Sequence, residues 1–297
     1  MKRKIVIAGG TGFIGNYLAN EFAKMGYEVL VISRSAGNVQ WANVQGIIHA
    51  LENADMLVNL AGKSVDCRYN ARNKAEILRS RTETTRILGE AIKKCENPPE
   101  LWINSSTATI YRHAEDRPMT EDQGEIGKGF SVDVATQWEK AFFDFKFKQT
   151  RQVALRMAIV LGKNGGVIKP YRNLVRFGLG GRQGNGRQMF SWIHAADVFN
   201  IILFVLEHKE LSGVYNCSAP NPVTNEILMK TFREKTNTRF GLPSPAWLLQ
   251  IGAGMVRTET ELILKSRWVV PEKLLKAGYT FRYPLLDAAL ENILYDA

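Results

Sequence analysis

Cysteine and histidine are scarce in this chain. Its 297 residues include three cysteines, Cys67, Cys95 and Cys217, and four histidines, and neither set shows the spacing of metal ligands. We therefore expect no metal site. An odd number of widely separated cysteines provides no disulfide framework, which indicates a reducing compartment, and we expect the protein to be cytoplasmic.

Long apolar runs and basic blocks are also absent. No apolar stretch reaches the roughly 18 residues that a membrane-spanning helix requires, and the first strand pattern begins too early to leave room for a signal peptide. We expect no membrane segment. The net charge is +10, but lysines and arginines are dispersed along the chain. This dispersion argues against nucleic acid as a partner and favours small anionic ligands.

Strand-like and helix-like patterns alternate along the chain. This alternation predicts parallel strands joined by right-handed crossovers, and hence an α/β, doubly wound sheet. The expected strands are 5–8, 28–32, 55–60, 101–104, 153–160 and 214–217. The expected helices are 14–25, 73–94, 132–147, 195–206, one from about 224, an apolar one after Pro245, and 285–294. Any strand between residues 38 and 50 is predicted to be weak.

One face of the helix expected at 73–94 is formed by Ile77, Arg81, Thr84, Leu88 and Ile92, which recur near helical spacing. The character of the sequence then changes after about residue 163, and five glycines fall within 178–186. We expect a dinucleotide-binding domain over 1–162, to which 189–217 returns, and a smaller, interleaved carboxy-terminal part over 163–297 on the substrate side.

Residues 8–16 carry a glycine at every third position between an apolar strand and a helical pattern. Gly9 permits a tight turn, Gly12 lets the backbone approach a pyrophosphate, and Gly15 allows close packing of helix on strand. The helix N-terminus then presents free N–H groups to phosphate. In this position the motif predicts the phosphate-binding turn of a dinucleotide fold.

Ligands of such sheets bind beyond the carboxyl ends of the strands. The second strand ends in Ser33 and Arg34, where an NAD-binding fold usually places an acidic residue for the ribose hydroxyls. An arginine flanked by serines suits a 2′-phosphate instead, which favours NADP(H) over NAD(H). The alternative is a solvated loop arginine.

The strand at 101–104 runs into Ser105, Ser106 and Thr107. This run of hydroxyls could polarise a carbonyl or hydroxyl of a ligand. The alternative is a polar strand end whose hydroxyls satisfy backbone groups.

Together these motifs resemble an extended short-chain dehydrogenase/reductase. The resemblance rests on the glycine turn, the strand end at 60–62, the Ser-Ser-Thr-x-x-x-Tyr run at 105–111 and Trp-Ile-His-Ala-Ala-Asp at 192–197. More narrowly, several segments resemble the atypical epimerase family that includes bacterial YfcH-like proteins: 74–82, 184–188, 191–194, 270–274 and 277–279. The similarity covers essentially the whole chain, including the characteristic carboxy-terminal segment of that family.

The resemblance implies a Rossmann-type fold that binds NADP(H). With the neighbouring strand ends, the expected cofactor contacts are Gly9, Thr11, Gly12, Phe13, Ile14, Gly15, Ser33, Arg34, Leu60, Ala61, Gly62, Lys63, Ser105 and Ser106. Thr107 matches the position of the usual catalytic serine or threonine of the family.

The chain departs from ordinary members in one respect. They use a Tyr-x-x-x-Lys pair on one helix face, in which the lysine lowers the pKa of the tyrosine. None of the nine tyrosines here is followed by lysine four residues later. If Glu139 is aligned with the glutamate found after the pair, Ser131 and Ala135 occupy its two positions, and neither can replace it.

A substitute acid or base would have to come from elsewhere. Tyr111, four residues after Thr107, is one candidate, and its alternative is a loop aromatic that covers the site. Lys63 could lie near the nicotinamide ribose or could be exposed. His194 is interpreted as a structural residue at a helix start, and nothing in the sequence activates Cys67.

Basic and polar residues in and before the glycine-rich stretch could form a substrate-side, anion-binding wall over the cofactor: Lys163, Asn164, Lys169, Arg182, Arg187 and Gln188. The alternative is a mobile surface loop.

The main functional hypothesis is an NADP(H)-dependent oxidoreductase or epimerase that acts on a small, anionic or sugar-like substrate. The alternative is a non-catalytic NADP(H)-binding redox sensor or regulatory protein. The long helices at 73–94 and 132–147 resemble those that pair extended family members into homodimers, although Phe142 and Phe145 could instead belong to the core.

Overall fold

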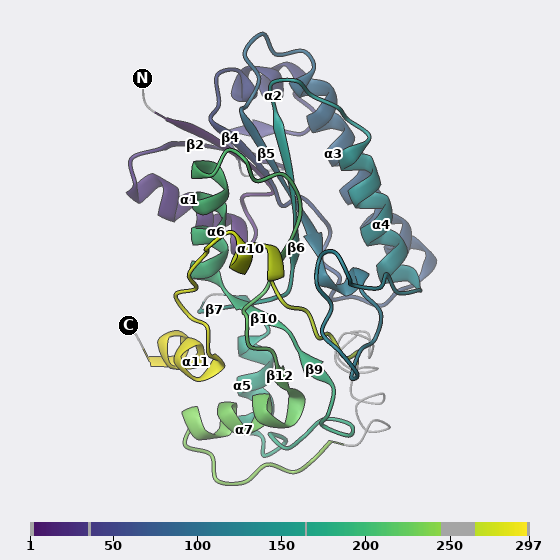
Figure 1. Cartoon of the computed structure of the whole chain (residues 1–297), viewed down its shortest axis with the longest axis vertical. Helices are drawn as coiled ribbons and strands as arrows, with labels where there is room; N and C mark the ends of the chain where they lie inside the picture. Colours follow the sequence, from purple (N-terminus) through teal and green to yellow (C-terminus); the bar gives the residue numbers. More distant parts are fainter. Residues whose placement is uncertain (1–2, 35–36, 164, 245–264, 296–297) are drawn as a thin grey trace.

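Seven parallel strands form the large sheet of the computed structural model, which describes residues 3–34, 37–163, 165–244 and 265–295 (Figure 1). Across the sheet their order is β11-β6-β5-β4-β1-β2-β3. The strands are β1 (Lys4–Ala8), β2 (Glu28–Ser33), β3 (Val39–Gln40), β4 (Met56–Asn59), β5 (Leu101–Thr107), β6 (Arg151–Met157) and β11 (Gly213–Cys217). The predicted α/β, Rossmann-type doubly wound fold is confirmed, and its strand order reverses between β1 and β4, where such sheets open a ligand crevice.

Helices cover both faces of this sheet (Figure 1): α1 (Phe13–Lys24) and α6 (Ala195–Glu207) on one face, and α2 (Val44–Leu51), α3 (Ala71–Ile92) and α4 (Phe130–Phe143) on the other. Alternate residues of β1 supply the two cores. Ile5 and Ile7 pack in the cluster with α1 and α6, whereas Val6 and Ala8 pack in the cluster with α2, α3 and α4. A sheet buried on both faces requires such continuously apolar strands.

The later part of the chain forms a smaller lobe with its own apolar core, around Trp192, Leu228, Phe232 and Leu290. It lies below the large sheet in Figure 1 and includes a three-stranded and a two-stranded sheet. Its elements are β7 (Ile159–Gly162), β8 (Gly165–Gly166), α5 (Ile168–Arg176), β9 (Met189–Phe190), β10 (Trp192–His194), β12 (Val223–Thr224), α7 (Asn225–Lys235) and α11 (Leu286–Tyr295). A short helix, α10 (Glu272–Lys276), places Leu274 in the apolar cluster that α1 and α6 form with the large sheet.

Among the differences from the sequence expectation, two lie in or beside the large sheet. Helix α2 was not predicted, because its eight residues are few for a periodic signal; Asn43 caps it by accepting the N–H of Gly46 at 2.8 Å. The strand expected at 153–160 is divided at Ala158, since β6 stays in the large sheet while β7 pairs with β8 and β10. The apolar run is unbroken there, so no local signal marks the change of sheet.

Phe142 and Phe145 pack inside the chain, against Trp102 of β5. These two rings therefore belong to the core. This is the alternative that the sequence left open to a role in a dimer contact. The apolar helix expected after Pro245 lies outside the described residues.

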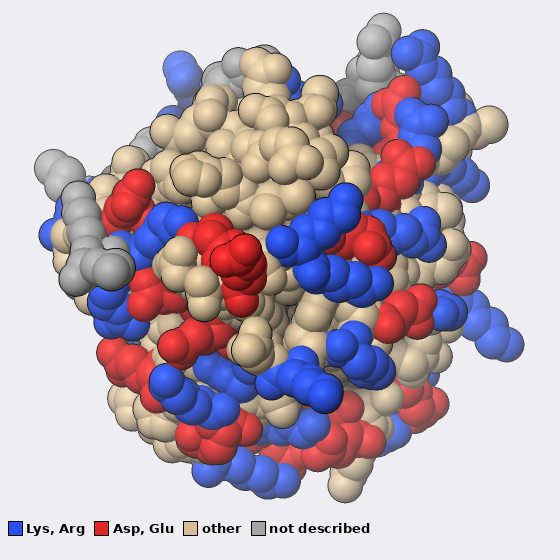
Figure 2. All heavy atoms as spheres, turned by 90° about the horizontal axis from the view of Figure 1, so that it is seen from above, with Lys and Arg blue, Asp and Glu red and all other residues tan. Residues whose placement is uncertain are grey.

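Basic and acidic side chains are interspersed on the face of the molecule that Figure 2 shows. None of the described helices is long and apolar enough to cross a membrane. The described part of the chain holds no group of three His, Cys, Asp or Glu side chains that could bind a metal ion.

His194 is the N-cap residue of α6, as its structural interpretation predicted. Its Nδ1 accepts the N–H of Ala196 at 3.0 Å, and its ring centroid lies 4.1 Å from that of Tyr283. Only 6% of the residue is exposed. Burial therefore lowers the pKa of His194 to about 4 from an ordinary value of 6.5.

This histidine should make the stability of the protein depend on pH. Between pH 6.5 and 4 the unfolded chain binds a proton at His194 that the folded chain does not, so the free energy of unfolding falls as pH drops, by at most about 3 kcal/mol. His194→Asn keeps a capping acceptor but does not titrate. Denaturant unfolding at neutral and mildly acidic pH should show a smaller loss for the variant; equal losses would contradict the prediction.

Candidate functional site

The glycine turn joins β1 to α1 by a close approach of backbone to backbone. Gly9 has a φ of +80°, and a Cβ there would lie 2.9 Å from backbone atoms of Leu60 and Ala61, just after β4. A Cβ on Gly15 would lie 2.6 Å from the backbone of Gly10. The turn therefore requires glycine at both positions.

Helix α1 points its N-terminus into the crevice without a side-chain cap. Gly12 is its N-cap residue and offers no capping group, so the first N–H groups of the helix are left for solvent or a ligand. A Cβ on Gly12 would meet nothing closer than the Gly9 oxygen, at 3.7 Å. This open N-terminus is the arrangement that binds phosphate groups.

A cavity of about 530 Å³ opens in front of this N-terminus, a size typical of ligand pockets. Its walls come from the glycine turn, the ends of β4, β5 and β6, and the facing sides of α3 and α4. It brings together most of the expected site residues: Gly9, Gly12, Phe13, Ile14, Gly15, Leu60, Gly62, Lys63, Ser105, Ser106 and Thr107. Thr11 is exposed beside the turn, and Ala61 is buried.

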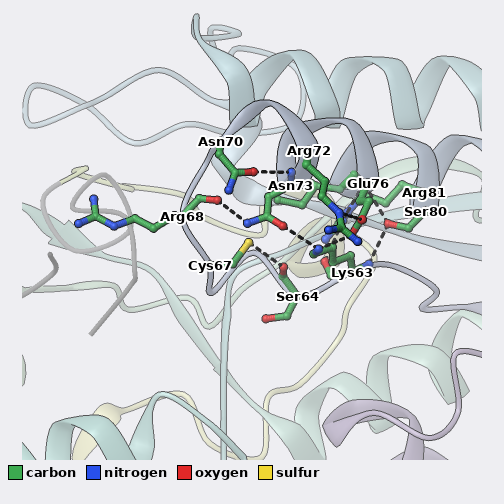
Figure 3. A network of polar contacts seen from close by, with 11 residues as sticks. Lys63, Ser64, Cys67, Arg68, Asn70, Arg72, Asn73, Glu76, Ser80 and Arg81 are labelled. Atoms are coloured by element: carbon green, nitrogen blue, oxygen red, sulfur yellow. Dashed lines mark hydrogen bonds and ion pairs between the residues drawn. The ribbon is translucent and has the colours of Figure 1, made fainter. Parts of the chain in front are cut away.

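Hydrogen bonds and an ion pair connect the loop that follows β4 to α3 (Figure 3). The backbone N–H of Lys63 donates to Ser80 Oγ at 2.8 Å, and its carbonyl accepts from Arg81 Nη1 at 3.0 Å. The ammonium group of Lys63 binds Glu76 and also donates to Asn73 Oδ1 at 2.9 Å. Lys63 therefore lines the cavity with its charge already neutralised.

The hydroxyl groups at the end of β5 have two roles: one donates its proton within the protein, and another keeps its proton for a ligand. Ser106 Oγ donates to Glu139 at 2.6 Å, which commits its proton to the fold. Thr107 precedes a short 3-10 helix (η1, Ala108–Ile110), and its Oγ1 accepts the N–H of Thr109 at 3.1 Å. No acceptor for the Thr107 proton is seen among the described residues, so this hydroxyl can donate to a ligand.

Helix α4 places Ser131 and Ala135, the two positions that the alignment on Glu139 assigns to the usual pair, in different surroundings. Ser131 lines the cavity. Ala135 has 0% exposure and packs in an apolar cluster with Ala108 and Tyr111. The described cavity wall therefore contains no Tyr-x-x-x-Lys pair.

The structure does not bring Tyr111 to the cavity. Its hydroxyl donates to Asn216 at 2.9 Å and accepts from Arg156 at 2.8 Å, and Arg156 forms a two-bond ion pair with Glu139. Burial raises the pKa of Tyr111 above its ordinary value. We therefore correct the interpretation of Tyr111 as a substitute acid or base: it is a core residue. Its partners come from distant parts of the chain, which the sequence could not show.

The expected anion-binding wall is not assembled at this cavity either. Arg182 and Arg187 are exposed and Gln188 is buried, and none of the three lines the cavity. The stretch instead hydrogen-bonds to residues 242–244, which draws it toward the smaller lobe. Lys163 borders a separate hollow of about 370 Å³.

Ser33 is buried at the carboxyl end of β2, and Arg34 follows it with an exposed side chain. Because β2 pairs with β1, Arg34 lies on the side of the glycine turn away from β4. Ser35 and Asn164 lie outside the described residues.

The cavity wall also includes side chains that were not predicted as site residues, among them Tyr69, Arg81 and Trp138. Trp138 is buried, and its Nε1 donates to Thr85 Oγ1 at 3.0 Å. The sequence placed Arg81 on one face of the predicted helix, with Ile77 and Leu88. An arginine on a face otherwise formed mainly by apolar residues was the signal in the sequence that could have identified it as a site residue.

Comparison with known proteins agrees with this geometry. Residues 5–129 match the model of the NAD dependent epimerase/dehydratase family, and residues 244–293 match a domain of unknown function, DUF1731. The human epimerase family protein SDR39U1 is 33% identical over 296 residues, covering 98% of this chain and 99% of the human protein. The epimerase family protein YfhF of Bacillus subtilis (strain 168) is 32% identical over 304 residues, covering 98% of each.

A solved structure extends the likeness to three dimensions. The crystal structure of human SDR39U1 (isoform 2) with NADPH superimposes with a TM-score of 0.90 at 33% identity, covering 99% of this chain and 100% of that one. The narrower resemblance to YfcH-like proteins stays a prediction. The chain belongs to the NAD dependent epimerase/dehydratase family, as an SDR39U1-like atypical short-chain dehydrogenase/reductase with a DUF1731 carboxy-terminal domain.

Proposed function

We propose that this protein binds NADP(H) in the cavity and acts as an oxidoreductase or epimerase on a small anionic or sugar-like substrate. One observation carries the proposal: a single cavity holds both an uncapped helix N-terminus behind a close-packed glycine turn and the free hydroxyl of Thr107. The first feature suits a dinucleotide phosphate, and the second suits a reacting oxygen.

The residues present fit a dinucleotide along its length. The N–H groups of the first turn of α1 would hold the pyrophosphate, and Leu60 and Gly62 would border the nicotinamide side. Ser33 and Arg34 would receive the 2′-phosphate at the end of β2. The presence of NADPH in the human SDR39U1 crystal structure supports this choice of cofactor.

A bound nicotinamide ring supplies or accepts a hydride. The role left to the chain is to hold the substrate oxygen. The hydroxyl oxygen of Thr107 is fixed by the N–H of Thr109, and its proton is free to donate to an oxygen that gains charge.

The alternative is a non-catalytic sensor of the NADP(H) redox state. Ser131 and the buried Ala135 favour it, because neither can supply the acid–base chemistry of the usual pair. The two functions share cofactor binding and differ in turnover.

Arg34→Ala tests the identity of the cofactor. Loss of a charge-assisted phosphate contact, about 1.5–3 kcal/mol, should weaken NADPH binding roughly tenfold or more relative to NADH. Calorimetric titration of both nucleotides measures the ratio. Lys24→Ala, which removes an exposed charge from the far end of α1, should leave it unchanged. An unchanged ratio in Arg34→Ala would refute the 2′-phosphate assignment.

Gly12→Ala separates ligand binding from folding. A methyl group at this N-cap has no close neighbour in the protein, so the melting temperature should hold. The same methyl obstructs the approach of a pyrophosphate, so NADPH affinity should fall by about an order of magnitude. In contrast, Gly15→Ala should lower the melting temperature, because its Cβ would overlap the backbone of Gly10. Full NADPH affinity in Gly12→Ala would contradict the binding mode.

Thr107→Val tests for catalysis. The purified protein is screened against carbonyl compounds and nucleotide sugars for consumption of NADPH absorbance. We expect any turnover to fall about a hundredfold in Thr107→Val and to survive in Thr107→Ser, which keeps the hydroxyl. Tight NADPH binding without turnover across the panel would instead support the sensor.

A further inference from the structure

Arg81 of α3 reaches into the cavity from the wall opposite α1. Its guanidinium carbon lies 5.1 Å from the centroid of the Trp138 ring, and it would lie 3.0 Å from a Cβ on Gly62. The glycine at position 62 therefore leaves space that the guanidinium occupies. Both of these neighbours line the cavity as well.

The hydrogen bonds of Arg81 use only part of its donor capacity. Nη1 donates to the carbonyl of Lys63 at 3.0 Å (Figure 3). It also donates to the carbonyl of Ile77, at 3.0 Å. A guanidinium has five N–H donors in a planar fork. Among the described residues no acceptor is seen for Nε or Nη2, so one edge of the fork remains for a ligand.

The charge of Arg81 is also uncompensated. No aspartate or glutamate of the described chain forms an ion pair with it, and the nearby Glu76 is engaged by Lys63 and Arg72. Burial lowers the pKa of Arg81 to about 10. An anion beside the guanidinium would offset this cost of desolvation.

Arg156 provides an internal comparison on the other side of α4. It is buried, whereas Arg81 is partly exposed, and Glu139 accepts two of its hydrogen bonds, at 2.8 and 2.9 Å. This ion pair raises the pKa of Arg156, whereas nothing comparable acts on Arg81. The fold thus supplies a counter-ion to its structural arginine and none to the arginine in the cavity.

We propose that Arg81 binds an anionic group of the substrate, a carboxylate or a phosphate, and so restricts this site to anionic substrates. The inference rests on the proposed function and names the substrate class. The proposed function already assigns the dinucleotide phosphates to the N-terminus of α1 and to Arg34, just after β2. Arg81 stands on α3 beside Trp138, and its fork suits a two-bond contact with an oxyanion.

Two variants test this assignment. Arg81→Met removes the charge and keeps the apolar stem against Trp138. Arg79→Met makes the same charge change on the same helix, at an exposed arginine that pairs only loosely with Glu83, at 3.8 Å. Arg81→Lys keeps the charge but lacks the fork, and serves also if the methionine variant fails to fold.

Calorimetry first gives the NADPH affinity of each protein. The NADPH-saturated proteins are then titrated with inorganic phosphate and with malonate at constant ionic strength. We expect saturable binding of one probe to the wild-type protein in the millimolar range, about tenfold weaker in Arg81→Met, severalfold weaker in Arg81→Lys and unchanged in Arg79→Met. NADPH affinity should stay within about twofold in all four proteins.

Three results would overturn the inference: no saturable binding of either probe to the wild-type protein, equal binding to Arg81→Met, or a tenfold loss of NADPH affinity in Arg81→Met with competition between probe and NADPH. The last would assign the guanidinium to a cofactor phosphate. If the wild-type protein binds no NADPH, the proposed function fails, and the same titrations on the unliganded protein still decide whether Arg81 holds an anion.

Discussion

The site depends on contact between two pieces of backbone, the glycine turn and the residues just after β4. Because Gly9 touches Leu60 and Ala61 directly, the turn lies at the point where the strand order reverses. The same turn starts α1 at Phe13, whose ring fills the space beside Gly162 and Gly165 of the smaller lobe. Turn, crevice and smaller lobe are therefore packed as one unit, and side chains at these glycines would separate them.

The cationic side chains in and near this crevice differ in whether a carboxylate pairs with them. Lys63 is neutralised by Glu76, and Arg156 by Glu139, so both act as structural ties. Arg81 has carbonyl partners but no carboxylate. A partly buried charge without a counter-ion costs free energy, and a bound anion would offset that cost. The presence or absence of a carboxylate partner therefore separates structural cations from a cation that is available to a ligand. The number of charged residues alone does not make this distinction.

The sequence predicted those parts of the molecule that local patterns encode. The apolar strand, the spaced glycines and the helix after them are contiguous, so the fold class and the turn could be recognised from residues 5–25. Tyr111 could not be placed, because its burial depends on Arg156 and Asn216, which the sheet brings from far along the chain. Arg81 was visible as a charge within an apolar face, but the space beside Gly62 that admits it exists only in three dimensions.

The burial of Ala135 limits how this site could be re-engineered. A lysine at that position would have to displace Ala108 and Tyr111 and carry a charge into an apolar cluster. A tyrosine at Ser131 without that lysine would gain little as an acid. Introducing the two residues alone would therefore not create an ordinary dehydrogenase site, because the cluster around Ala135 would first have to be redesigned to admit a longer, charged side chain.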